Sequence, residues 1–231
     1  MSRFALHEHF GSQRLVRAIL KHLPLLPFSL TRFVIDIWKD CRTNPESRGV
    51  LLLGWNAWWF GVEILAGFVL IVFSALYYKV PTRCAWVGIV IFYFAFSRTF
   101  EVSYAFVKDV ADRLREVQPN TNLTTGQRIV MAFRSYVGLI VNFAIMYFLL
   151  PALSVVRIFG WSLPVDKAPC FQLNNFFDAL YFSVMTITTT GYGDLSPSIW
   201  PTRVLAMWEV LSGLLLIAMA LAIYLSNSKK T

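Results

Sequence analysis

The chain has 231 residues, of which 57% are hydrophobic and 15% are charged, and its formal net charge is +8. A soluble globular domain has about 45–50% apolar and about 25% charged residues, and the mean hydropathy here is +0.57. This composition argues against a soluble enzyme and against a nucleic-acid-binding domain, and it predicts an all-α membrane protein. The positive net charge then indicates lysine and arginine gathered on one side of a membrane.

Residues 1–48 are predicted to form a cytoplasmic, basic, amphipathic arm. Apolar side chains of this segment share one helical face, opposite a basic face; the apolar ones are Leu15, Val16, Ile19, Leu20 and Leu23, and the basic ones are Arg14, Arg17 and Lys21. This pattern is typical of helices that lie at a membrane surface. We therefore expect one or two short helices on the inner leaflet.

Four apolar stretches follow, each close to or above the ~20 residues that a helix needs to cross the hydrocarbon core. They cover residues 49–78, 84–107, 136–160 and 204–225. The predicted organisation is a peripheral pair of helices at 49–107, a basic cytoplasmic linker at 108–134, a pore domain at 135–226 and a short tail at 227–231.

The distribution of lysine and arginine predicts the orientation. The arm, the linker and the tail contain 8, 5 and 2 of these residues, whereas the segments on the opposite side contain 5. Because basic loops face the cytoplasm, both termini are predicted inside, in a multi-pass protein of the plasma membrane.

Charged residues within the first two spans need an explanation, since charge inside a bilayer is costly. Glu63 lies near the middle of the first span, and Arg98 and Glu101 lie three residues apart in the second, on one helix face. One interpretation is a voltage or proton sensor. We favour an ion pair that joins the two spans, because a voltage sensor needs several arginines on one helix.

The segment 174–194 has the most unusual pattern in the chain. An apolar, aromatic stretch too short to cross the bilayer precedes three threonines and Gly-Tyr-Gly, and Asp194 follows. Glycine permits backbone conformations that other residues avoid, and irregular backbone at membrane depth occurs only where it is buried or lines a watery path. The pattern predicts a re-entrant helix followed by backbone carbonyls that replace an ion's hydration shell.

The run from Thr188 to Asp194 resembles the selectivity filter of tetrameric pore-loop potassium channels. The last span, with Glu209 and Gly213, also resembles the inner helix of small bacterial pore-only channels that carry a glutamate there. The resemblance implies four transmembrane helices and a re-entrant pore helix per subunit, K⁺ as the permeant ion, a lipid membrane as the surroundings and a homotetramer. It implies no organic cofactor, no nucleic-acid partner, no small-molecule substrate and no enzymatic activity.

Carried over residue by residue, the resemblance implies a role for each part of the pore. The filter would be Thr189, Thr190, Gly191, Tyr192 and Gly193, with K⁺ bound at the first four. Thr188, Asp194, Tyr181, Phe182 and Glu209 would support the filter. Gly213 would be a hinge of the inner helix, and Leu214, Ile217, Leu221 and Leu225 would line the pore.

Two positions depart from the usual pattern. Thr190 replaces a valine or isoleucine, so a hydroxyl is expected behind the filter. Met185 stands where some relatives have a glutamate that pairs with the aspartate after the filter, so Asp194 needs another partner. We hypothesise that Glu209 braces the back of the pore helix instead.

Three alternatives stay open at this stage. The departure at Thr190 allows a weakly selective Na⁺/K⁺ channel, and a non-conducting accessory subunit could keep the same fold. Cys84 and Cys170 are both predicted on the outer side, where an oxidising compartment would allow a disulfide between them.

Overall fold

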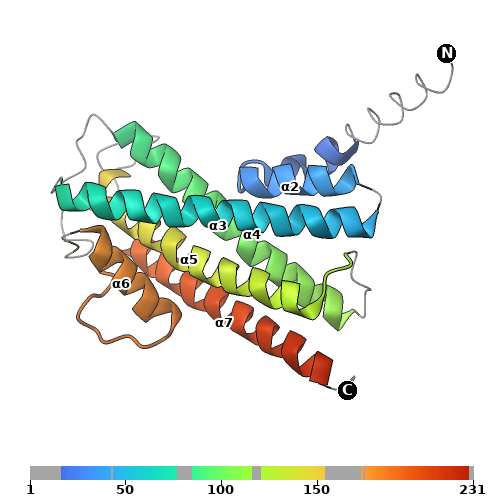
Figure 1. Cartoon of the computed structure of the whole chain (residues 1–231). Helices are drawn as coiled ribbons and strands as arrows, with labels where there is room; N and C mark the ends of the chain where they lie inside the picture. Colours follow the sequence, from blue (N-terminus) through green and yellow to red (C-terminus); the bar gives the residue numbers. More distant parts are fainter. Residues whose placement is uncertain are drawn as a thin grey trace, which may run out of the picture.

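A computed structural model describes residues 17–42, 44–76, 85–115, 121–153, 173 and 175–228. These parts of the chain form helices and turns, with no strand among them. The elements are η1 (Leu23–Leu25), α2 (Leu30–Asp40), α3 (Pro45–Leu76), α4 (Ala85–Leu114), α5 (Thr125–Leu153), α6 (Phe176–Ile187) and α7 (Trp200–Ser228). Figure 1 shows α3, α4, α5 and α7 as the long helices.

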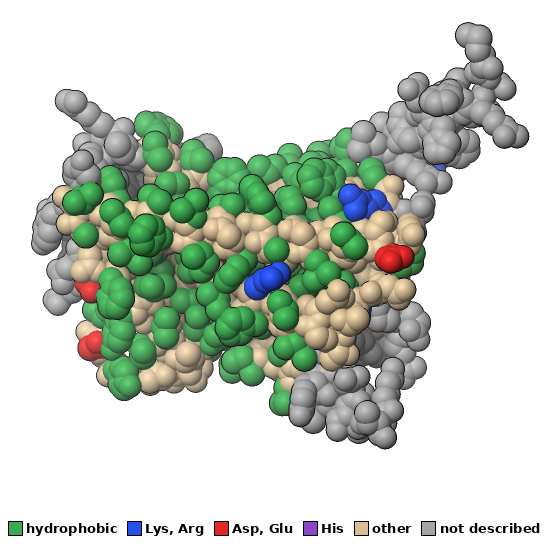
Figure 2. All heavy atoms as spheres, in the orientation of Figure 1, with side chains coloured by type: hydrophobic (Ala, Val, Ile, Leu, Met, Phe, Trp, Pro, Cys, Tyr) green, Lys and Arg blue, Asp and Glu red, His purple; other side chains and the backbone are tan. Residues whose placement is uncertain are grey.

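Four of these helices are long and apolar enough to cross a membrane: Pro45–Leu76, Trp86–Asp112, Thr125–Leu150 and Trp200–Leu221. The prediction of an all-α membrane fold with four spans is confirmed. Figure 2 shows apolar side chains spread over the length of the visible face, with few charged side chains among them. Such a surface is expected of a protein surrounded by lipid.

The helices extend further than the apolar stretches. The segment 108–134 was predicted as a linker, but α4 continues through it to Leu114 and α5 already begins at Thr125. A capping box starts α5: the Thr124 N–H donates to Gln127 Oε1 (2.9 Å) and the Gln127 N–H donates to Thr124 Oγ1 (3.3 Å). The helix therefore begins well before its apolar run does.

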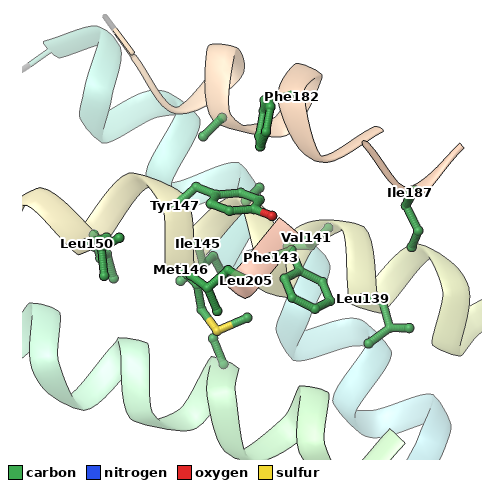
Figure 3. Packing of buried hydrophobic residues seen from close by; sticks show 14 of the residues in the cluster. Leu139, Val141, Phe143, Ile145, Met146, Tyr147, Leu150, Phe182, Ile187 and Leu205 are labelled. Atoms are coloured by element: carbon green, nitrogen blue, oxygen red, sulfur yellow. The ribbon is translucent and has the colours of Figure 1, made fainter. Parts of the chain in front are cut away.

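Helix α5 is the centre of the fold. It packs against α3, α4, α6 and α7, and its span is the most buried of the four. Figure 3 shows its core side chains, which include Phe143 and Tyr147, facing the surrounding helices. The ring of Phe143 meets Trp208 of α7 edge-on at 5.6 Å, and Tyr147 meets Phe182 of α6 at 5.0 Å. One helix thus positions both the short helix α6 and the last span.

Helix α2 packs against α4 and, less extensively, against α3. Its N-cap Ser29 accepts from the Arg32 N–H (3.1 Å) and donates to the Ser97 carbonyl (2.7 Å). Because Ser97 lies near the middle of the span Trp86–Asp112, the start of α2 reaches the middle of that span. The sequence indicated an amphipathic helix here, but not its packing along α4.

Candidate functional site

Helix α6 has 12 residues, and hydrogen bonds satisfy backbone groups at both of its ends. At its start, Asn175 accepts from the Asp178 N–H (3.0 Å), and the Phe176 N–H donates to Ser74 Oγ of α3 (3.1 Å). At its end, the Thr188 N–H donates to the Val184 carbonyl (3.1 Å). A helix this short does not cross a bilayer, which matches the re-entrant helix predicted from the sequence.

The loop that follows α6 has an alternating backbone. The torsion φ is positive at Thr189 (57°), Gly191 (54°) and Gly193 (83°), whereas it is negative at Thr190 and Tyr192 between them. Alternation of right- and left-handed conformations turns successive N–H groups to one side of the chain and the carbonyls to the other. The Thr190 and Gly191 N–H groups accordingly both donate to the Met185 carbonyl (3.0 and 3.2 Å).

Thr189 is the one non-glycine residue with positive φ in the described parts of the chain. A β-branched residue rarely adopts this conformation, which costs on the order of 1–3 kcal/mol. Backbone strain of this kind persists where the surrounding structure enforces it and a function uses it. The loop is therefore a candidate functional site on backbone geometry alone.

Side chains of the loop are exposed in the single subunit, and Tyr192 exposes 71% of its surface. Two contacts brace the loop from within. The Thr188 and Thr190 hydroxyls lie 2.9 Å apart, so the departure at Thr190 adds a hydrogen bond that a valine could not make. The Tyr181 hydroxyl bonds the Asp194 carboxylate, which therefore has a partner despite Met185.

Glu209 lies behind the pore helix, fully buried, and joins three helices. Tyr147 of α5 donates to Glu209 Oε2 (2.7 Å), and the Ser183 hydroxyl of α6 bonds Glu209 Oε1. The same hydroxyl lies 2.9 Å from the Ile140 carbonyl of α5. The sequence led to the hypothesis that Glu209 supports the back of the pore helix, and Glu209 lies there. Its partners Tyr147 and Ser183 were not predicted.

The other predicted residues of α7 fall on two faces. Gly213 is buried, and a Cβ there would lie 2.5 Å from Ile187 Cγ1 at the end of α6, so glycine allows the two helices to approach closely. The helix is continuous through this residue. Leu214, Ile217 and Leu221 are exposed on the opposite face, where no described residue covers them. The Leu225 side chain lies outside the described residues.

The charges of the first two spans form one buried network. Arg98 Nε lies 3.1 Å from Glu63 Oε1, so the favoured ion pair between the two spans is present. Arg98 Nη1 also lies 2.8 Å from Glu101 Oε1 within α4. Asn142 of α5 donates to Glu63 (3.0 Å), and Trp55 of α3 donates to Glu101 (2.9 Å). The network therefore connects the peripheral pair to the central helix α5.

Sequence reasoning missed the residues that complete these networks, namely Tyr147, Ser183, Asn142 and Gly138. A side chain at Gly138 would collide with the Glu63 carboxylate, so glycine makes room for the network. A buried tyrosine usually has a hydrogen-bond partner, and this would have been the available signal for Tyr147. Cys84 and Cys170 lie outside the described residues, whereas Cys41 is free and exposed.

Comparison with known proteins agrees with this geometry. Residues 136–227 match the family described as "Ion channel", a region that contains most of α5, all of α6, the loop and nearly all of α7. This segment is similar to the pore region of ion channels, and the four long apolar helices indicate a multi-pass membrane protein. The family and the relatives below are ion channels, not enzymes, as the sequence predicted.

Among curated relatives, the chain is 27% identical over 177 residues to a hyperpolarization-activated voltage-gated potassium channel of Methanocaldococcus jannaschii. That alignment covers 66% of this chain and 83% of the relative. The chain is 35% identical over 78 residues to two pore potassium channel a of Oryza sativa, which covers 34% of this chain but only 22% of the relative. A two-pore potassium channel 1 of Arabidopsis thaliana is 49% identical over 52 residues, which covers 22% of this chain and 14% of the relative. No solved structure gives a match.

Proposed function

We propose that the protein is a potassium channel that conducts K⁺ passively through carbonyls of Thr189, Thr190, Gly191 and Tyr192. The observation that carries this proposal is the alternating sign of φ along the loop, which gathers successive carbonyls on one side of the chain. Carbonyls so arranged replace the hydration shell of K⁺, and repulsion between ions in adjacent sites allows them to leave. The potassium-channel relatives support the choice of ion.

The same proposal assigns four copies of the chain to one pore. One subunit supplies one loop, and a ring of carbonyls around an ion needs several loops related by closed symmetry. A homotetramer would turn two exposed surfaces toward its axis or toward neighbouring subunits. They are the loop after α6 and the apolar face of α7 formed by Leu214, Ile217 and Leu221. The pore would thus exist only in the assembly.

The proposal includes the domain organisation and the membrane topology that the sequence predicts. The arm at 1–48 and the tail at 227–231 would face the cytoplasm of a plasma-membrane protein, and 135–226 would form the pore domain. The excess of lysine and arginine on that side supports this orientation. Glu209, with Tyr147 and Ser183, would hold the pore helix in place behind the filter.

Purified protein in proteoliposomes tests conduction directly. With K⁺ and Na⁺ gradients in opposite directions, the reversal potential is expected to follow the K⁺ gradient. Gly191→Ala should abolish K⁺ selectivity or flux, because alanine disfavours φ near +54°. Gly61→Ala is the matched control, since no atom lies within 4 Å of a Cβ there. A reversal potential that ignores the K⁺ gradient would refute the proposal.

The same recordings address the second candidate function, a weakly selective Na⁺/K⁺ channel. Thr190 favours this candidate, because its hydroxyl bonds Thr188 where potassium channels usually have an apolar side chain. A reversal potential between the K⁺ and Na⁺ equilibrium values would support weak selectivity. An absence of current in correctly assembled protein would support the third reading, a non-conducting accessory subunit.

A further inference from the structure

Two lysines lie at the predicted cytoplasmic ends of neighbouring helices. Lys39 lies in the last turn of α2, and the exposed Lys108 lies one turn before the end of the span Trp86–Asp112 in α4. Among the described residues, no ion pair or hydrogen bond joins either ammonium group to another side chain. They are cations from two helices, close to the level at which a bilayer has its headgroups.

The carboxylates of α2 are already occupied. Asp36 accepts from Arg32 Nε at 2.6 Å, and Asp40 lies 3.0 Å from both Lys21 Nζ and His22 Nε2. Both carboxylates of α2 therefore pair with cations other than Lys39.

Lys39 and Lys108 lie on helices that pack against each other, and the Arg32 guanidinium of α2 lies 4.9 Å from the Tyr104 ring of α4, one turn before Lys108. Burial, followed by the Arg32 and Lys108 charges, lowers the pKa of Lys39, although Asp36 and Asp40 act in the opposite direction. Two cations, Arg32 and Lys108, therefore add to the effect of burial on Lys39. An anion from outside the chain would offset their repulsion of Lys39.

Exposed aromatic side chains lie next to Lys39. Trp38, beside Lys39, exposes 50% of its surface and meets Trp55 edge-on at 5.7 Å. Trp58, which exposes 60%, stacks on Trp55 at 6.4 Å. Tryptophan is enriched where the hydrocarbon of a bilayer meets its headgroups, so the lysines and the tryptophans place one surface against lipid.

We propose that Lys39 and Lys108 bind the phosphate headgroup of an anionic phospholipid. The two ammonium groups would face the phosphodiester, and the exposed tryptophans would lie along the glycerol and the upper acyl chains. The observations favour a lipid over a soluble anion because the cations lie at the end of a membrane span beside exposed tryptophans. The site is separate from the proposed conduction pathway. A test of lipid binding therefore does not depend on which ion the pore selects.

Native mass spectrometry of the detergent-solubilised protein tests the site with phosphatidylglycerol as the probe and phosphatidylcholine as the neutral comparison. Lys39→Gln with Lys108→Gln is expected to weaken phosphatidylglycerol binding by about tenfold or more, because each lysine near an anionic surface contributes roughly a factor of five. Lys21→Gln is the control: it removes the same charge from the same region, but Lys21 already pairs with Asp40.

A second double variant, Lys39→Arg with Lys108→Arg, separates loss of charge from loss of fold. It keeps both positive charges and is expected to keep most of the binding. The assignment is wrong if both lipids bind the parent equally, or if the glutamine variant binds phosphatidylglycerol as the parent does. It is also wrong if inorganic phosphate displaces the lipid at similar concentration, since the site would then take a soluble anion.

Discussion

The buried carboxylates of Glu63 and Glu209 are stabilised by different kinds of partner. Glu63 (4% exposed) sits in the peripheral pair beside the Arg98 guanidinium, with Asn142 as a further donor. Glu209 (0% exposed) sits behind the pore helix, where its described partners are the hydroxyls of Tyr147 and Ser183. A countercharge compensates the first acid, whereas hydroxyl groups compensate the second.

The difference predicts different tolerance of substitution. A buried ion pair is costly to break, because the remaining charge stays in a low-dielectric interior without compensation. A hydroxyl-bonded acid can be replaced by a neutral amide, because an amide keeps an acceptor oxygen. Moreover, Ser183 has one hydroxyl proton with two acceptors in reach, Glu209 and the Ile140 carbonyl, so an added amide donor is readily used.

Arg98→Leu should have the largest effect on stability. It leaves Glu63 and Glu101 buried with no cation between them, so we expect the free energy of unfolding to fall by about 3–5 kcal/mol. Thermal unfolding of the purified protein in detergent measures this loss. Arg42→Leu, which removes an exposed arginine, is the control, and equal stability of the two variants would contradict a paired network.

The same substitution at the two acids gives the sharpest comparison. Glu63→Gln leaves Arg98 with Glu101 alone and should lower stability by a few kcal/mol, about as much as loss of a buried partner does. Glu209→Gln should change stability by less than about 1 kcal/mol, whereas Glu209→Leu, which removes the buried acceptor of the Tyr147 and Ser183 hydroxyls, should cost about 1–3 kcal/mol. Thermal unfolding of all three variants, with K⁺ selectivity measured alongside, checks the order. If Glu209→Gln proved as damaging as Glu63→Gln, both acids would need their charge.

Tyr147→Phe tests one arm of the hydroxyl network. The ring and its edge-on contact with Phe182 remain, while the hydrogen bond to Glu209 is lost. We expect a loss of about 1 kcal/mol in unfolding experiments and a less stable filter, seen as faster decay of K⁺ current. Tyr93→Phe is the control, because that hydroxyl makes a long 3.4 Å contact to a backbone carbonyl. A greater loss at Tyr93 would argue against a special role for Tyr147.

Thr190→Val should have the smallest effect. It removes the hydroxyl bond to Thr188 but leaves the backbone carbonyl in place, so we expect stability to change by less than about 1 kcal/mol. Recordings in mixed K⁺ and Na⁺ should show selectivity for K⁺ that is equal to or higher than that of the parent. Lower selectivity in the variant would mean that the hydroxyl pair itself shapes the filter.

The sequence was sufficient for features that depend on neighbouring residues. Long apolar runs predicted four spans, the spacing of Arg98 and Glu101 indicated a shared face, and the threonine and glycine run identified the loop. The start of α5 could also have been predicted, because Thr124 and Gln127 form a capping box. That signal was overlooked because the apolar run begins later.

Contacts between distant segments could not be foreseen in the same way. Asn142 is 79 residues from Glu63, and Tyr147 is 62 residues from Glu209. Side-chain periodicity says which face of a helix is buried, but not which polar group on another helix will meet it. The hypothesis for Glu209 placed it correctly behind the pore helix, yet its partners depended on how α5 packs.

The packing of α2 along α4 has a consequence for how the protein is made. Ser29 and Thr31 bond Ser97, which follows them by 68 and 66 residues. Synthesis proceeds from the N-terminus, so the polar start of α2 leaves the ribosome before its partner exists. Helix α2 can therefore complete these contacts only after Ser97 and the rest of α4 have been synthesised.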